Sequence, residues 1–161
     1  MKIIMILHSK TGVTLNLADS LRDRLVQDGH DVHRTLLETA EPISDNPRPN
    51  TVYKFTNLPD LSDADIVMFG GPVWAFRPSP VIRQAVRDLG TKLKGKTVLP
   101  FLTMGFPFAW MAGNSSLQGL RRLCADFGAK TLQGIVLTSR QKNKPECHQA
   151  LAETVSQRLN G

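Results

Sequence analysis

Hydroxyl and glycine residues near the amino terminus have the types and spacing of an anion-binding loop. The four residues are Ser9, Thr11, Gly12 and Thr14. They follow the unbroken apolar run of residues 3–7, and a helical spacing of apolar residues begins after them at Leu17. The first N–H groups of a helix have no acceptor within the helix, so they favour a negative group, and glycine lets the backbone approach it. We expect a phosphate at this junction, and a simple helix cap without a ligand is the alternative.

The other candidates for side-chain chemistry do not form a group that would catalyse a reaction or bind a metal. None of the four histidines has a convincing carboxylate or metal partner in the sequence pattern; they are His8, His30, His33 and His148. Cys124 and Cys147 both fall in helical patterns, so we expect free thiols rather than a disulfide or a metal cluster. We therefore predict no catalytic side chain and no metal.

Strands alternating with helices must position the anion-binding loop. Helical spacing predicts a helix after each of the first, third and fourth strands and one after the last, with Ser79 and Pro80 as one start signal. Prolines and asparagines make residues 40–50 a surface loop. Such alternation predicts an α/β fold, a parallel sheet covered on both faces, in one domain over residues 1–161. The five predicted strands cover residues 3–7, 31–37, 66–70, 97–103 and 131–138.

Residues 9–14, Ser-Lys-Thr-Gly-Val-Thr, resemble the phosphate loop of the flavodoxin family, Thr/Ser-x-Thr-Gly-x-Thr, and also follow the first strand. Residues 65–76 are similar to the family's third strand and the flavin-contacting loop after it, and residues 93–105 to the fourth strand and the second flavin loop. The chain departs from the family at Val13, where many members have Asn, and in its basic charge. The resemblance covers essentially the whole chain and implies a three-layer, doubly wound, five-stranded parallel sheet of order 2-1-3-4-5.

The resemblance also implies FMN as the cofactor and a set of residues that bind it. Trp74 is the first choice to stack on the flavin ring, and Phe106, Phe108 and Trp110 remain open choices for its other side. Trp74 could instead be a surface aromatic packed over the core. The other three aromatics could instead form a hydrophobic lid or an oligomer contact. The implied cofactor-binding residues are Ser9, Lys10, Thr11, Gly12, Val13, Thr14, Pro72, Val73, Trp74, Ala75, Phe76, Thr103, Met104, Gly105, Phe106 and Trp110.

The net charge of +6 is unevenly distributed along the chain. Residues 1–65 carry seven Lys and Arg against ten Asp and Glu, whereas residues 66–161 carry 13 against four. No nucleic-acid motif accompanies the basic half, so we expect no nucleic-acid binding. The basic charge indicates a solvated face, with acidic protein partners or anionic substrates as the functional alternative. No apolar run reaches the roughly 20 residues of a membrane helix, and no signal sequence is present, so we expect a cytoplasmic protein without membrane insertion.

Three functions are compatible with these features. The first is electron transfer through non-covalent FMN, with a redox partner protein or a small quinone or flavin as acceptor. The second is an NAD(P)H-dependent quinone or flavin reductase of the same fold, in which Arg77 or the basic stretch 140–144 contacts an anionic substrate. The third is a flavin-free phosphate-binding or interaction domain. The oligomeric state is left open.

Overall fold

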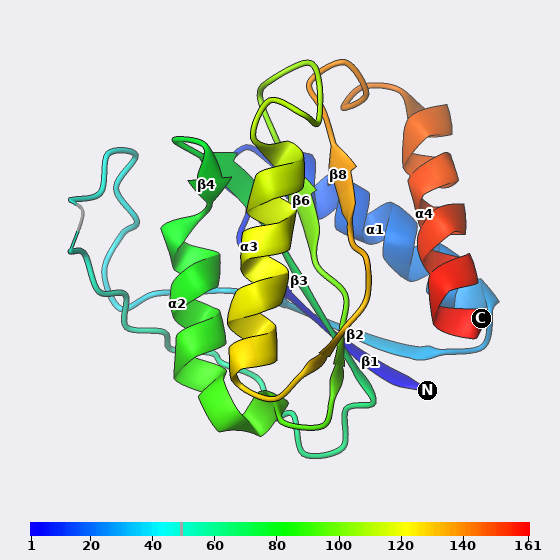
Figure 1. Cartoon of the computed structure of the whole chain (residues 1–161), viewed down its shortest axis with the longest axis horizontal. Coiled ribbons are helices and arrows are strands. Elements are labelled where there is room, and N and C mark those ends of the chain that lie inside the picture. Colours follow the sequence, from blue (N-terminus) through cyan, green and yellow to red (C-terminus); the bar gives the residue numbers. More distant parts are fainter. Residues whose placement is uncertain (49) are drawn as a thin grey trace.

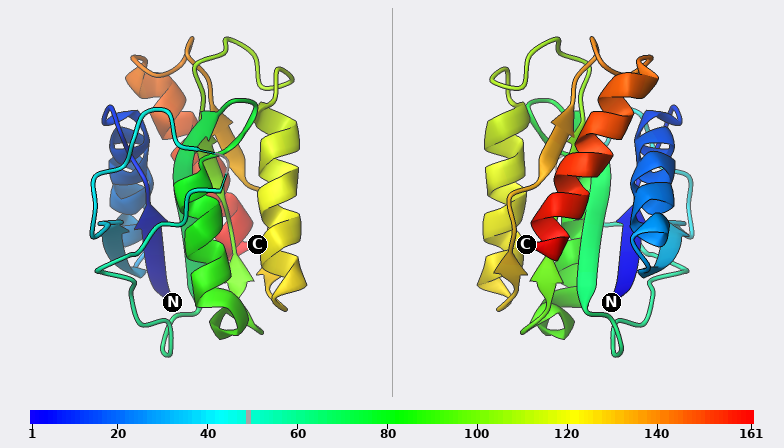
Figure 2. Two further views of the ribbon diagram at one scale, coloured as in Figure 1. Left: turned by 90° about the vertical axis from the view of Figure 1, so that its left-hand side faces the viewer. Right: turned by 90° about the vertical axis from the view of Figure 1, so that its right-hand side faces the viewer.

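The centre of the structure, a computed structural model that describes residues 1–48 and 50–161, is a parallel β-sheet with helices on both faces (Figures 1 and 2). Pro49, in the loop predicted over residues 40–50, lies outside the described residues. The strands are β1 (Lys2–Leu7), β2 (Asp31–Leu36), β3 (Ile66–Trp74), β4 (Arg77–Pro78), β5 (Thr97–Val98), β6 (Phe101–Thr103), β7 (Lys130–Thr131) and β8 (Ile135–Leu137). The helices are α1 (Val13–Gln27), α2 (Pro80–Leu89), α3 (Gly113–Asp126) and α4 (Pro145–Asn160), with a 3-10 turn η1 (Gly90–Leu93).

The predicted strand order is confirmed, but the fourth and fifth strands are each broken in two. The order across the sheet begins with β2, β1 and β3. The fourth position is shared by β5 and β6, and the fifth by β7 and β8. Val98 lies opposite Thr131, whereas Phe101 lies opposite Ile135, so the fifth strand contains one extra residue, as in a β-bulge. The prediction of two continuous strands was therefore wrong. The break in the fourth strand contains Pro100, which has no N–H to donate to a neighbour.

Each face of the sheet has its own apolar core. Along β1, Ile3 and Met5 belong to the core under α1 and α4, whereas Ile4 and Ile6 belong to the core under α2 and α3. Successive side chains of a strand point to opposite faces, so a central strand covered on both sides needs apolar residues at every position. The apolar run of residues 3–7 is unbroken because both faces of β1 are buried.

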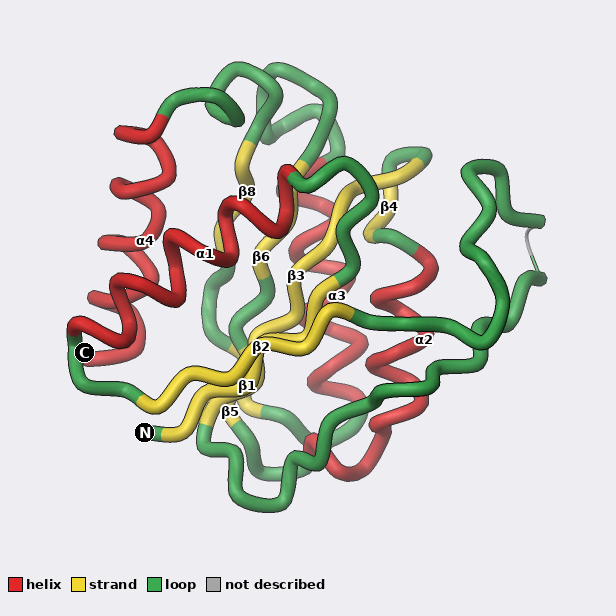
Figure 3. The backbone as a smooth tube through the Cα atoms, turned by 180° about the vertical axis from the view of Figure 1, so that it is seen from behind, coloured by secondary structure: helices red, strands yellow, loops and turns green. Residues whose placement is uncertain are grey.

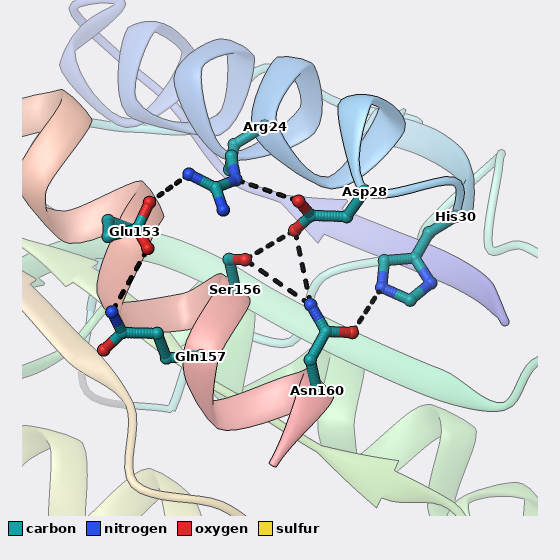
Figure 4. Close-up of polar contacts among 7 residues, drawn as sticks. All are labelled: Arg24, Asp28, His30, Glu153, Ser156, Gln157 and Asn160. Atoms are coloured by element: carbon teal, nitrogen blue, oxygen red, sulfur yellow. Dashed lines mark hydrogen bonds and ion pairs between the residues drawn. The ribbon is translucent and has the colours of Figure 1, made fainter.

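Polar contacts join the ends of α1 and α4 at the edge of the sheet where the strands begin (Figure 4). Arg24 Nε donates to Asp28 Oδ1 at 3.0 Å, and the same guanidinium pairs with Glu153. Ser156 Oγ donates to Asp28 Oδ2 at 2.5 Å. The Ser156 hydrogen bond and then the Arg24 guanidinium hold the pKa of Asp28 below its usual value. This polar cluster joins α4 to the carboxyl-terminal end of α1.

The loops that follow β1, β3, β6 and β8 all leave the sheet at its carboxyl-terminal edge (Figure 3). Open parallel sheets bind ligands at this edge, where neighbouring crossovers run to opposite faces. In the part of the chain that the structure describes, no helix is both long and apolar enough to cross a membrane.

Candidate functional site

The loop between β1 and α1 leaves the amino-terminal end of the helix open to an anion. Gly12 is the N-cap residue, with a left-handed φ of 88° that glycine adopts without strain. Because glycine has no side chain, the N-cap residue makes no side-chain capping hydrogen bond. The first helical bond runs from the Asn16 N–H to the Gly12 carbonyl at 2.9 Å, so the preceding N–H groups lack a helical acceptor. Leu15 N–H lies 3.4 Å from Ser9 Oγ. No acidic side chain lies in the first turn of α1 to oppose an anion there.

Two side-chain contacts tie this loop to its neighbours. Thr14 is buried, and its Oγ1 lies 2.8 Å from Thr103 Oγ1 at the end of β6, so this hydroxyl is engaged within the protein. Lys10 Nζ pairs with Asp45 at 2.8 Å and links the loop to residues 40–48. Thr11 is the hydroxyl residue of the loop that remains exposed. Of the hydroxyls predicted to face a phosphate, Thr11 is therefore the one best placed to do so.

The hairpin formed by β3 and β4 has a strained turn. Trp74 lies opposite Arg77, and the two residues between them, Ala75 and Phe76, have positive φ values of 48° and 64°. A two-residue turn of this kind favours Asn and Gly, and a left-handed conformation costs other residues about 1–2 kcal/mol each. Ser116 Oγ donates to the Phe76 carbonyl at 3.2 Å and holds the turn in place.

Phe76 extends from this turn across to the loop after β6. Its ring stacks on Phe106 with centroids 5.1 Å apart and planes 17° from parallel. Phe76 is nevertheless 63% exposed, so core packing does not explain its position. Strain at an exposed, fixed turn is typical of a functional site, because packing or ligand contacts must compensate for it. Trp74 lines the hollow described next, whereas Phe76, predicted to bind the cofactor, lines a different hollow between α2 and α3.

A hollow of about 350 Å³ lies between the loops at the carboxyl-terminal edge. Its volume is within the range of small-molecule sites, and no Asp or Glu is among the described residues that line it. Ser139 and Lys142, in the loop after β8, also line it. Neither was predicted to bind the cofactor, but Lys142 belongs to the basic stretch 140–144 that was predicted to contact an anionic substrate. We call this hollow the cofactor cleft. Eight of the predicted cofactor-binding residues line it: Thr11, Val13, Pro72, Val73, Trp74, Thr103, Met104 and Gly105.

The other predicted residues lie around the cofactor cleft or away from it. Lys10, Ala75 and Phe106 line a larger neighbouring hollow of about 700 Å³, of which Trp74 forms a shared wall. Trp110 lines neither hollow: it is 74% exposed and stacks on Phe108 with centroids 6.0 Å apart. Trp74 is thus the tryptophan that the structure brings to the cofactor cleft.

His8 is a buried residue of the site that the sequence pattern did not single out. It follows β1, is 4% exposed, and its ring meets Trp74 edge-on at 5.0 Å between centroids. His8 Nδ1 lies 2.6 Å from Ser79 Oγ, which also accepts the Val81 N–H at 3.1 Å as the N-cap of α2. The direction of the His8–Ser79 hydrogen bond depends on which ring nitrogen carries the proton, since the Ser79 hydroxyl can both donate and accept. Burial lowers the pKa of His8 to about 4.

We expect His8 to make folding stability depend on pH in the range between about 4 and 6.5. Below the ordinary histidine pKa the unfolded chain binds a proton that buried His8 does not, so stability is lost as the pH falls. Between pH 7 and 4.5 this loss is about 2–3 kcal/mol, and His8→Gln should remove it. Urea unfolding of both proteins at the two pH values measures the difference. An NMR titration in which His8 protonates near pH 6.5 would contradict the assignment.

Solved structures with the same arrangement of helices and strands match most of the chain. A flavodoxin from Megasphaera elsdenii is 22% identical, with 94% of this chain and 98% of that chain covered and a TM-score of 0.65. A flavodoxin from Streptococcus pneumoniae is 18% identical, with 99% and 98% covered and a TM-score of 0.68. A flavoprotein in complex with FMN from Lactobacillus acidophilus is 15% identical, with 84% and 92% covered and a TM-score of 0.62. No protein-family model and no curated sequence matches the chain. The chain has the flavodoxin-like fold.

Proposed function

We propose that the protein binds FMN non-covalently in the cofactor cleft and transfers electrons through it. The observation that carries the proposal is that eight residues implied by the phosphate-loop and flavin-loop patterns, from three separate segments, line one hollow. The open end of α1 lies at the phosphate side of that hollow, with Thr11 and Val13 in its wall. The flavodoxin-like fold and the FMN in the Lactobacillus acidophilus flavoprotein support the same assignment.

The residues around the cofactor cleft would bind and orient the cofactor, and FMN itself supplies the redox chemistry when bound. The helix end and Thr11 provide donors for the phosphate. Trp74 provides a flat apolar surface for the ring, and the edge-on contact with His8 fixes the orientation of the indole. The loop after β6 contributes Met104 and Gly105 to the wall of the cleft, and the Met104 N–H already donates to the Leu137 carbonyl at 3.0 Å.

The protein would exchange electrons with a redox partner protein or with a small quinone or flavin. A carrier needs a separate enzyme to reduce it, whereas an NAD(P)H-dependent reductase is reduced by the nucleotide directly. The larger hollow beside Trp74 favours the reductase as second candidate, because Arg77 and Arg83 line it and could contact an anionic substrate. We place the carrier first, since two of the solved structures with this fold are flavodoxins.

The first test concerns the phosphate loop. Thr11→Val removes one exposed donor, and the loss of a hydrogen bond to a charged group should weaken FMN binding about tenfold or more. Riboflavin lacks the phosphate, so its affinity should change much less. Titration of apoprotein with both flavins, followed by absorbance and fluorescence, measures the two ratios. Equal losses for FMN and riboflavin would show that the loop does not hold the phosphate.

The second test uses the two tryptophans as a matched pair. Trp74→Ala removes a wall of the cofactor cleft and should weaken FMN binding about tenfold, while Trp110→Ala, outside the cleft, should leave it unchanged. Quenching of tryptophan emission by FMN should likewise be lost mainly in Trp74→Ala. Circular dichroism confirms that both variants are folded. Unchanged FMN affinity in Trp74→Ala would remove ring stacking on this residue from the proposal.

The third test separates carrier from reductase. NADH or NADPH is added anaerobically to the FMN-loaded protein, and the flavin absorbance is followed over time. For a carrier we expect no bleaching until a flavodoxin reductase is added. Rapid bleaching by either nucleotide alone would show the reductase activity instead.

A further inference from the structure

Four arginines surround a hollow between α2, α3 and the β3–β4 hairpin. α2 and α3 lie side by side on one face of the sheet (Figure 1). The hollow has a volume of about 370 Å³, and Asp126 is the one acidic residue among the described residues that line it. We call this hollow the arginine groove. Its arginines are Arg77, Arg83, Arg87 and Arg122.

Among the described residues that line this groove, four arginines share a single carboxylate, that of Asp126. In the ion pairs found among the described residues, none of the four takes part. Arg83 is half-buried and donates from Nε to the Pro78 carbonyl at 3.1 Å, and Arg87 follows four residues later on the same face of α2. Burial, and then the charges of Arg87 and Arg77, lower the pKa of Arg83. Like charges gathered in this way destabilise one another, and a bound anion would relieve the repulsion.

The arginine groove continues towards the cofactor cleft. Arg77 and Arg83 also line the larger hollow of about 700 Å³, whose other walls include Trp74 and Phe106. A ligand could therefore extend from beside Trp74 to the arginines between the two helices. At Gly119, on the α3 side, an added Cβ would meet nothing within 4 Å, so the wall of the groove is open there.

We propose that the arginine groove binds a small ligand that carries at least two phosphate groups. Guanidinium groups present paired donors that match phosphate oxygens, and arginines from both helices and the hairpin can contact more than one phosphate. The site is separate from the proposed FMN phosphate site, which lies at the start of α1. The concave shape favours a small polyanion over the flat contact of an acidic protein.

Titration of the protein with inorganic pyrophosphate tests the proposal, with and without FMN so that the phosphate loop is filled in one arm. We expect saturable binding by calorimetry in both arms, weaker at high ionic strength. The double variant Arg87→Gln/Arg122→Gln should weaken it by about tenfold or more, because both exposed guanidinium groups are lost. FMN affinity should remain that of the unmodified protein, so failure of FMN binding and failure of this site are distinguishable.

The matched control is Arg22→Gln/Lys130→Gln, which removes the same charge from two exposed residues, on α1 and β7, that do not line the groove. It should bind pyrophosphate within about twofold of the unmodified protein, since distant surface charges are screened. Adenosine monophosphate, NADH and NADPH as further probes distinguish an inorganic polyphosphate from a dinucleotide. Absence of saturable binding, equal loss in the control, equal affinity for inorganic phosphate, or tighter binding of a polyglutamate peptide would each overturn the proposal.

Discussion

The parallel pairing of β3 with a strand on each side is the constraint on which the rest of the structure depends. β3 pairs with β1 along Ile66 to Gly70 and with β5 and β6 along the other edge, in one continuous register. This register sets the carboxyl ends of three strands at one level, and the anion loop, the hairpin and the aromatic loop therefore meet. Gly70 makes the close approach possible, because a Cβ there would overlap the Phe101 ring. A slip of one residue would turn every side chain of β3 to the opposite core.

Local chemistry made parts of this arrangement predictable from the sequence. The run Ile3–Leu7 favoured a strand covered on both faces, and Ser79 with Pro80 begins α2 as its residue types indicate. The glycine at position 12 has the left-handed conformation that a turn into a helix needs. These features depend on a few neighbouring residues, so spacing alone reveals them.

Features that depend on contacts between distant segments could not be read in the same way. The fourth and fifth strands are broken at Pro100 and Gly134, which lie side by side across the sheet. A Cβ on Gly134 would collide with the Pro100 carbonyl, so the two breaks depend on each other. The burial of Thr14 against Thr103 and of His8 against Ser79 likewise joins residues far apart in the chain. Ala75 and Phe76 are poor turn formers by propensity, and their conformation depends on contacts with α3 and the Phe106 loop.

The ends of the chain lie together at the edge of the sheet opposite the cofactor cleft. His30 joins them, with Nδ1 3.4 Å from the Met1 amino group and Nε2 3.1 Å from Asn160 Oδ1. A tether at either end, to an electrode, a bead or a fused enzyme, would therefore leave the cleft facing outward. The same proximity would let a short peptide join residues 1 and 161 and allow the chain to be opened at another surface loop.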